Sequence, residues 1–336
     1  MAITSRFITA LAATSVLAMA ALGATTAPGA AGYKILMISK SQGNAYFAAA
    51  ESGATEAAKE LGDDLILNSP ANATATEQSR IIQSGIAQKV DGIILSAMDP
   101  NAVVPDMQQA QSEGVKTITY DADIAVPGRS LMAMQATNEG IGRSLPQVIC
   151  NVVPKCSGEI AILSSDPNSP NLSVWVKWAQ EELKGDKYAN LKLVDIAYGG
   201  ETDAGAYTRT QELLKAHPNL AGLIVPGSVQ VAAAARAVKD EGASGKIQLT
   251  GLGLPSELKA YVADGTIKQF VLWNPSDLGY LAVNMIHQLI AKTLKTDPGT
   301  EFVAGKLGKF TVGADGVVLL GPPLVIDAKN IGSLHF

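Results

Sequence analysis

The stretch from residue 90 to residue 123 reads VDGIILSAMDPNAVVPDMQQAQSEGVKTITYDAD, and it decides the fold class. It contains a short aliphatic run, GIILS at 92–96, and a second run rich in β-branched residues, VKTITY at 115–120. Between the two runs, residues 103–113 repeat their apolar side chains at helical spacing. A buried strand, a helix and a second buried strand in close succession are typical of a βαβ unit with parallel strands.

The same alternation continues from residue 33 to residue 294. Further buried strands are predicted at 33–39, 158–163, 191–198, 222–225, 247–251 and 268–272. Further helices are predicted at 47–61, 76–89, 138–152, 171–184, 204–216, 229–241, 256–263 and 277–294. Strands that alternate with helices over such a length predict doubly wound α/β sheets.

Two interruptions indicate two such sheets in series. An irregular stretch is predicted from Asp121 to Thr137, after the first series of strands ends near Tyr120. After Leu294 the chain changes to short strands and Gly-rich turns, which indicates a crossover and an edge ribbon rather than another βα unit.

Composition excludes several classes of function. The 336 residues are 47% hydrophobic and 17% charged, the balance of a folded globular protein. They include 26 Lys and Arg against 31 Asp and Glu, for a net charge of -5, and no basic run. We therefore expect no nucleic-acid partner, because the patch of basic residues that contacts phosphates is missing.

The N-terminal region, residues 1–31, predicts export. It has one charge, Arg6, then an apolar stretch from Phe7 to Leu22, and then small residues. This pattern is typical of a cleaved secretory signal peptide, with the cut after Ala24, Ala27 or Ala31. A membrane anchor is the alternative, but the apolar stretch is interrupted and falls short of the ~20 residues that a span needs.

Export determines how the two cysteines, Cys150 and Cys156, are interpreted. In an oxidising compartment a disulfide is the first interpretation. Metal ligation competes with it, but the spacing lacks the second Cys pair or His of a zinc site. Two separate reduced thiols remain the other possibility.

Polar and aromatic residues follow the predicted strands at their carboxyl ends, where open α/β sheets bind ligands. Such a mixture suits a neutral ligand rich in hydroxyls, because buried polar groups need partners and apolar sugar faces pack on aromatic rings. The candidate ligand-binding residues are Lys40, Asn44, Phe47, Asp121, Asp123, Asn171, Trp175, Pro226, Ser228, Trp273 and Asn274.

Enzyme and cofactor motifs are absent or incomplete in the sequence. The run from Gly251 to Ser256 has Ser in place of the last glycine of a dinucleotide fingerprint, and no P-loop or GxSxG elbow occurs. Asp121 and Asp123 would share a face of an extended segment as an acid/base pair, but no nucleophile or metal ligand accompanies them. We expect no catalysis, no cofactor and no metal.

Three motifs in this order resemble a known family. They are NAYFAAAESGATEAAKELG at 44–62, VDGIILSAMDP at 90–100 and VKTITYDAD at 115–123. An exported chain with these motifs resembles the type I periplasmic substrate-binding proteins of ABC sugar importers, over residues 33–336. It is most similar to the subgroup of rhamnose-binding proteins and autoinducer-2 receptors. The resemblance implies two doubly wound α/β lobes with a ligand cleft between them.

With the two interruptions, the resemblance implies discontinuous lobes. The first is expected to hold residues 32–135 and 275–304, and the second residues 136–274 and 305–336. The chain would then cross near Gln135–Thr137, near Leu272–Pro275, and again after residue 300.

The resemblance also implies roles for site residues. The ligand lysine and aspartate of autoinducer-2 receptors fall on Lys40 and Asp121, and the Pro of their backbone-contact loop is Pro226. An Asp-Gln pair of these receptors corresponds here to Asn171 and Leu172, which removes one charge and one amide.

Ribose-type binders differ from this chain at two further positions. Gly253 replaces their carboxylate after the seventh strand, and Trp273 replaces their hinge-side glutamine. The resulting pocket suits a rhamnose-like deoxy sugar, a pentose or a polyol.

Several of these residues have a structural alternative. The alternative for Lys40 is a solvated lysine in a loop, and the alternative for Trp273 is a side chain that only packs at the hinge. Phe47 and Trp175 would otherwise be core anchors of their helices, and Asn44 and Asn274 turn residues.

The function predicted is a monomeric periplasmic receptor that binds a small sugar and delivers it to an ABC permease. The alternative is a receptor for an autoinducer-2-type signal or a chemotaxis ligand, with a chemoreceptor as partner.

Overall fold

A computed structural model describes residues 32–336 together with Met1 and Ala2. Of the predicted signal peptide, residues 1–31, residues 3–31 lie outside the described residues. Gly32–Phe336 form one compact unit built on two parallel sheets.

The first sheet has the strand order β13-β5-β4-β3-β1-β2, with every neighbouring pair parallel. Its strands alternate apolar side chains between two faces. Ile35 and Met37 of β1 join one core cluster, and Leu36 and Ile38 join the other. Both faces are therefore buried, which explains why these strands are continuous aliphatic runs. The strands are β1 (Lys34–Ile38), β2 (Asp64–Leu67), β3 (Gly92–Leu95), β4 (Lys116–Tyr120), β5 (Leu131–Met134) and β13 (Val317–Leu319).

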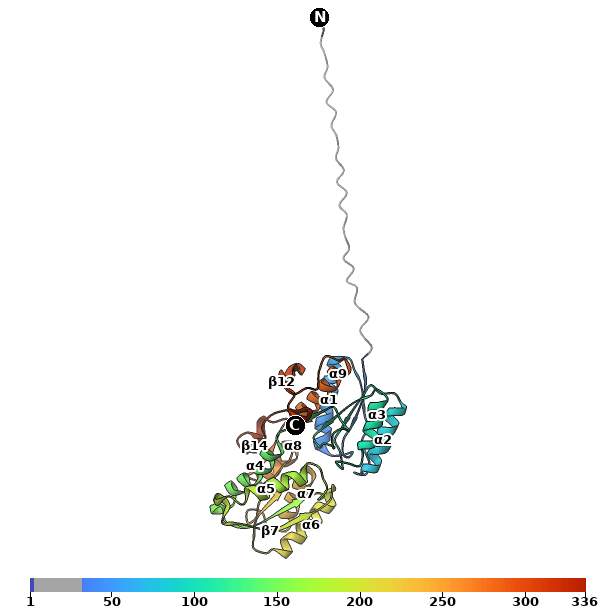
Figure 1. Ribbon diagram of the computed structural model, residues 1–336. Coiled ribbons are helices and arrows are strands. Elements are labelled where there is room, and N and C mark those ends of the chain that lie inside the picture. Colours follow the sequence, from blue (N-terminus) through green and yellow to red (C-terminus); the bar gives the residue numbers. More distant parts are fainter. Residues whose placement is uncertain (3–31) are drawn as a thin grey trace. The chain divides into compact units, whose positions relative to one another are not determined.

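Helices cover both faces of this sheet. On one face α2 (Ala75–Ala87) packs beside α3 (Val104–Ser112), and on the other α1 (Ala45–Leu61) packs against α9 (Pro275–Ile290) (Figure 1). A Cβ at Gly279 would lie 1.9 Å from the backbone oxygen of Ala50, so glycine is what allows α1 and α9 to approach so closely.

The second sheet repeats the order of the first. β7, β6, β8 and β9 lie side by side and parallel, and single parallel bridges join β9 to β10. In both sheets the first strand lies between the second and the third, which makes a topological switch point at the carboxyl ends. The strands are β6 (Gly158–Ser164), β7 (Leu191–Tyr198), β8 (Leu220–Val225), β9 (Gln248–Gly251) and β10 (Gln269–Leu272). The helices are α4 (Asn138–Val152), α5 (Leu172–Glu182), α6 (Asp203–Ala216), α7 (Ser228–Asp240) and α8 (Pro255–Ala263).

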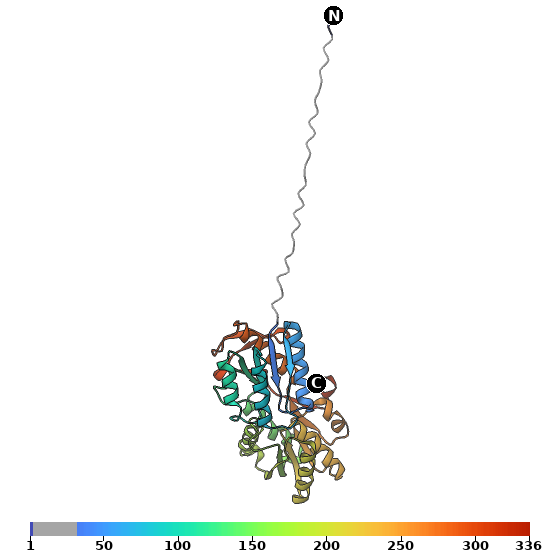
Figure 2. The ribbon, with the colours of Figure 1, turned by 90° about the vertical axis from the view of Figure 1, so that its right-hand side faces the viewer.

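The chain passes between the sheets three times: between β5 and α4, between β10 and α9, and between β13 and β14 (Leu324–Asp327). β14 pairs antiparallel with β10, so the segments that end the chain join both sheets (Figure 2). A short ribbon, β11 (Glu301–Val303) with β12 (Lys309–Thr311), precedes β13.

Two expectations about these segments are wrong. The whole of residues 305–336 was expected in the second lobe, but Val317–Leu319 pair with β5 in the first sheet. The stretch 121–137 was expected to be irregular, but it contains β5. Both strands are short, and β13 pairs with β5, a strand distant in sequence that a local pattern does not show.

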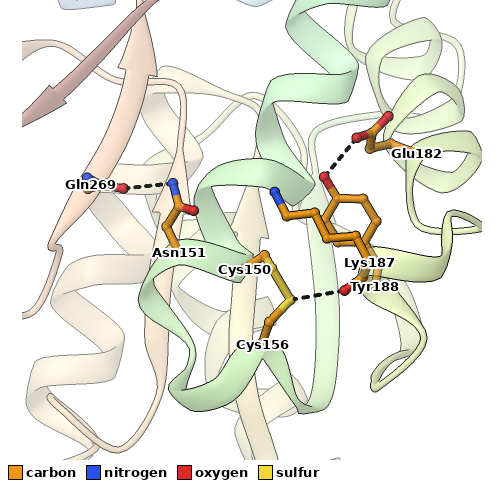
Figure 3. Close-up of a disulfide and its surroundings, with 7 residues drawn as sticks. All are labelled: Cys150, Asn151, Cys156, Glu182, Lys187, Tyr188 and Gln269. Atoms are coloured by element: carbon orange, nitrogen blue, oxygen red, sulfur yellow. Dashed lines mark hydrogen bonds between the residues drawn. A yellow bond between two sulfur atoms is a disulfide. The ribbon is translucent and has the colours of Figure 1, made fainter.

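A disulfide joins Cys150 in the last turn of α4 to Cys156, just before β6 (Figure 3). Figure 3 also shows the hydroxyl of Tyr188 donating to Glu182 at 2.7 Å. The disulfide thus links the end of α4 to the start of the second sheet.

Candidate functional site

A cavity lies where the carboxyl ends of strands from both sheets converge. It leaves about 50 Å³ for the centres of water molecules. Its wall includes loops that follow β1, β4, β6, β7, β8 and β10. The lining residues are Lys40, Asn44, Tyr46, Phe47, Asp121, Asn171, Leu172, Trp175, Glu201, Pro226, Gly227, Ser228, Gln230 and Trp273.

Asp121 follows β4 directly and is the buried acid of the cavity. Its φ is 58°, a left-handed conformation that Asp tolerates better than most residues. Its Oδ2 accepts a hydrogen bond from Ser96 at 2.8 Å, and its Oδ1 accepts one from the Tyr46 hydroxyl at 3.1 Å. The carboxylate is therefore fixed by donors from the residue that follows β3 and from α1.

Burial raises the pKa of the Asp121 carboxyl above its ordinary value. The charge of Lys40 and the hydrogen bond from Ser96 act in the opposite direction without cancelling the effect of burial. Burial, together with the Asp121 charge, raises the pKa of the Tyr46 hydroxyl well above its ordinary value. Tyr46 is thus held as a hydroxyl donor to Asp121.

Lys40, which follows β1, reaches from the first sheet to the second. Its Nζ donates to Asn171 Oδ1 at 2.9 Å and to Ser169 Oγ at 3.3 Å. Only 4% of Lys40 is exposed, so the alternative of a solvated loop lysine is wrong. Asn171 Nδ2 in turn lies 3.5 Å from Asp121 Oδ1.

Aromatic side chains from distant segments form the apolar wall. Trp175 of α5 and Trp273, next to β10, meet edge to face with ring centroids 5.8 Å apart. Trp273 Nε1 donates to the Tyr46 hydroxyl at 2.9 Å, and Trp175 Nε1 donates to Asn138 Oδ1 at 2.8 Å. These bonds hold both indoles in place, so their carbon surfaces are available for an apolar ligand face.

Three helices begin at the cavity and direct backbone N–H groups toward it. Asn44 caps α1 by accepting from the Tyr46 N–H at 2.9 Å, and Asn171 accepts from the Leu172 N–H at 3.0 Å. α7 begins at Ser228 without a side-chain cap. Asn44 is therefore both a local capping residue and part of the cavity wall. The uncapped start of α7 leaves backbone N–H groups that can donate to a hydroxylated ligand.

A loop after β7 adds a second acid, Glu201. Gln230 Nε2 donates to the Gly200 oxygen at 2.6 Å, which clamps this loop to α7. Sequence reasoning missed Glu201, Gln230 and Tyr46. Glu201 could have been found from the sequence, because it follows the carboxyl end of the predicted strand 191–198, where open α/β sheets bind ligands.

Two predicted site residues lie elsewhere. Asp123 is not in the cavity wall, because its carboxylate forms a bidentate ion pair with the buried Arg129, with distances of 2.6 and 2.8 Å. Asn274 also lies outside that wall, and its side chain caps α9 by accepting from the Ser276 N–H at 3.0 Å. The other nine candidates line the cavity.

Over residues 32–336, no cluster of three or more His, Cys, Asp or Glu side chains has the geometry to hold a metal ion. In the same part of the chain, no helix is both long and apolar enough to span a membrane.

Two α/β sheets with a shared cavity at their carboxyl ends define a type I periplasmic binding protein fold. The model of the periplasmic binding protein domain family matches residues 35–294, and the chain belongs to this family.

Solved structures support the assignment. One similar structure is a sugar ABC transporter from Actinomyces odontolyticus, 34% identical, with a TM-score of 0.74, covering 90% of this chain and 97% of that one. Another is an ABC transporter solute-binding protein from Clostridium phytofermentas with bound L-rhamnose, 28% identical, with a TM-score of 0.86, covering 90% and 98%. Among curated proteins, a D-apiose import binding protein of Actinobacillus succinogenes is 25% identical over 239 residues, 71% of this chain and 76% of that protein.

Proposed function

We propose that this protein is an exported, monomeric receptor that captures one small neutral sugar in the periplasm and delivers it to the permease of an ABC importer. The observation that carries the proposal is the cavity wall, in which Asp121, Lys40 and helix N–H groups face the indoles of Trp175 and Trp273. Such a wall pairs ligand hydroxyls with fixed polar groups and the apolar ring face with aromatic carbon.

A deoxy sugar of the rhamnose type is the substrate that we propose. Leu172 contributes apolar surface to the cavity and has no group to pair with a buried hydroxyl. The related structure with bound L-rhamnose supports the same choice. A pentose or a small polyol is the next candidate.

The lobes would close about the three chain passages. We propose residues 32–135 with 275–304 as the body of the first lobe and 136–274 as that of the second, with the tail shared between them. Lys40 already joins the two sheets through Asn171 and Ser169, and a ligand that contacts both sheets would favour closure in the same way.

Calorimetric titration of the chain from residue 32 onward tests the proposal. L-rhamnose and L-mannose form a matched pair, because they differ only by a hydroxyl on C6. We expect saturable binding of L-rhamnose, tighter than L-mannose by about five- to a hundredfold, because an unpaired buried hydroxyl costs about 1–3 kcal/mol.

A variant separates the sugar preference from binding itself. Leu172→Asn supplies an amide and should narrow the difference between the two sugars. Pentoses, polyols and autoinducer-2 complete the panel. Tighter binding of autoinducer-2 would favour the signal receptor, with a chemoreceptor as partner. If no member of the panel binds, the proposed function is wrong.

A further inference from the structure

The proposed function leaves one acid of the cavity wall, Glu201, without a role. Glu201 lines the cavity from the second sheet, where it follows β7, whereas Asp121 lines it from the first sheet, where it follows β4. The charge of Glu201 reaches the Asp121 carboxyl, because it adds to burial in raising the pKa of that group. Carboxylates from both sheets therefore act on the same cavity.

The backbone that precedes Glu201 is fixed on two sides. The Gly200 N–H donates to the backbone oxygen of Ser165 at 2.9 Å, which ties the loop to the end of β6. The Gly200 oxygen accepts from Gln230 Nε2 at 2.6 Å, which ties the loop to α7. Gly200 has a φ of 72°, a left-handed conformation that glycine adopts without strain.

The backbone that follows Glu201 enters a capped helix. The side chain of Thr202 caps α6 by accepting from the Gly205 N–H at 3.2 Å. Glu201 is thus a single residue between a clamped glycine and a helix cap, so its backbone position is set by its neighbours. None of the ion pairs within residues 32–336 includes Glu201.

Gln230, in the first turn of α7, holds this loop with an amide that is used locally. It is 1% exposed, and its Nε2 is occupied by the Gly200 oxygen. Its Oε1 fills the space beside Gly227, where an added Cβ would lie 1.9 Å from it. The start of α7 has no side-chain cap, and the N-terminus of a helix favours a negative charge nearby. The loop and α7 therefore present the carboxylate of Glu201 to the cavity.

We propose that Glu201 is a specificity-determining residue that accepts a hydrogen bond from a sugar hydroxyl at the second sheet, and that Gln230 is the residue that positions it. This inference rests on the proposed function, because it assigns a further contact to the same sugar. A hydroxyl donates and a carboxylate only accepts, so the pair forms a charge-assisted hydrogen bond. With Asp121 accepting at the first sheet, the cavity selects a ring that carries hydroxyl groups on two of its edges.

Calorimetric titration of the chain from residue 32 onward with L-rhamnose, or with the panel sugar that binds more tightly, tests the contact. Glu201→Gln keeps the size of the side chain and one acceptor oxygen but removes the charge. We expect sugar affinity to fall about fivefold or more, because a charge-assisted hydrogen bond is roughly twice as strong as a neutral one.

The matched control is Asp203→Asn, two residues further on. Asp203 forms an exposed ion pair with Arg236 and lies outside the cavity wall. An exposed ion pair contributes little, so this change should leave sugar affinity within about twofold.

Sugar analogues that each lack one hydroxyl identify the partner of Glu201. The 1-, 2-, 3- and 4-deoxy analogues of L-rhamnose, or those of the sugar used, are titrated against the parent protein and Glu201→Gln. The analogue that lacks the partner hydroxyl should bind both proteins within about twofold, whereas the complete sugar distinguishes them about fivefold or more. If every analogue distinguishes the two proteins as strongly as the complete sugar does, Glu201 contacts none of these hydroxyls and the proposal is wrong.

Gln230→Met tests the positioning role, because it keeps the length of the side chain and removes the hydrogen bond to the Gly200 oxygen. We expect affinity to fall about threefold or more in the parent protein but less than about twofold in Glu201→Gln, because Gln230 acts through Glu201. An equal loss in both backgrounds would refute the positioning role.

A measurement without sugar tests the placement of the Glu201 carboxylate. Glu201→Gln should lower the pKa of the Asp121 carboxyl in a carbon-13 NMR titration, since it removes a charge that raises this pKa. Asp203→Asn should leave it unchanged. An unshifted pKa in Glu201→Gln would place the Glu201 carboxylate away from the cavity and overturn the proposal.

The outcomes separate this inference from the proposed function. If the parent protein binds no sugar of the panel, the proposed function fails and the role of Glu201 fails with it. If the parent protein binds a sugar and Glu201→Gln binds it equally well, only the role of Glu201 fails. A lower free energy of unfolding with unchanged affinity would instead assign Glu201 to the stability of the loop and α7.

Discussion

Replacing Asp121 with Asn tests the sugar site most directly. The carboxylate is 5% exposed and already accepts hydrogen bonds from Ser96 and Tyr46. An amide of the same shape loses the charge, and its Nδ2 cannot accept from either donor. Removing a charge-assisted partner costs about 1.5–3 kcal/mol, so we expect sugar affinity to fall about ten- to a hundredfold.

The matched control is Asp123→Asn, two residues further on. Asp123 pairs with the buried Arg129 and lies outside the cavity wall, so its loss should lower the free energy of unfolding and leave affinity within about twofold. Calorimetric titration with the best sugar of the panel and denaturant unfolding separate the two effects. If Asp121→Asn binds like the parent protein, the sugar site lies elsewhere.

The pH dependence of Asp121 gives an independent check. Its folded-state pKa is raised, so the protonated form is favoured in the folded protein relative to the unfolded chain. The protonated carboxyl of Asp121 therefore contributes its full stabilisation of the folded state below the ordinary pKa of Asp. This contribution is lost as the pH rises through the raised pKa. The ionised form accepts ligand hydroxyls better, so sugar affinity should fall as pH drops through the raised pKa. Asp121→Asn should remove this pH dependence from both the stability and the sugar affinity. If the variant keeps the pH dependence of sugar affinity, Asp121 is not its source.

Three further predictions concern other parts of the chain. Trp273→Ala should weaken sugar binding about three- to tenfold by calorimetry, because it removes an aromatic face, whereas Asp315→Ala in the tail should have no effect. The double change of Cys150 and Cys156 to Ser should lower the free energy of unfolding by about 2–3 kcal/mol in denaturant titrations, with unchanged affinity; equal stability with and without reductant in the parent protein would contradict this. N-terminal sequencing of the native protein should find a start between residues 25 and 32, and recovery of Met1 would exclude cleavage.

Local pattern was enough to predict most of the fold. Buried parallel strands are aliphatic on both faces, so runs such as 92–96 and 222–225 stand out from their amphipathic helices. The misses have a physical cause. β5 and β13 have four and three residues, and β13 is a strand because it pairs with β5, 185 positions away in sequence (317 − 132). No window of neighbouring residues contains that information.

The site was predictable where topology alone places a side chain. Asp121 and Lys40 follow strands directly, so the carboxyl-end rule was sufficient. The carboxyl-end rule failed for side chains that cap a helix or form an ion pair within their own lobe. Asn274 precedes Pro275 at a helix start, a pattern that indicates a cap, and Asp123 pairs with Arg129, whose approach depends on the tertiary fold.

A sugar that binds in this cavity must replace hydrogen bonds that Lys40 now forms with other side chains. About 50 Å³ is less than the ~150 Å³ of a cavity that binds benzene in another protein, so we expect that a sugar does not fit while Lys40 spans to Asn171 and Ser169. The lobes must separate or Lys40 must release these oxygens, and the ligand then supplies replacement hydroxyls. Measured affinity is therefore a difference between two sets of contacts that both involve Lys40. A Lys40→Met variant would remove Lys40 from both sets, so its change in affinity reports only the excess of the ligand contacts over the internal ones.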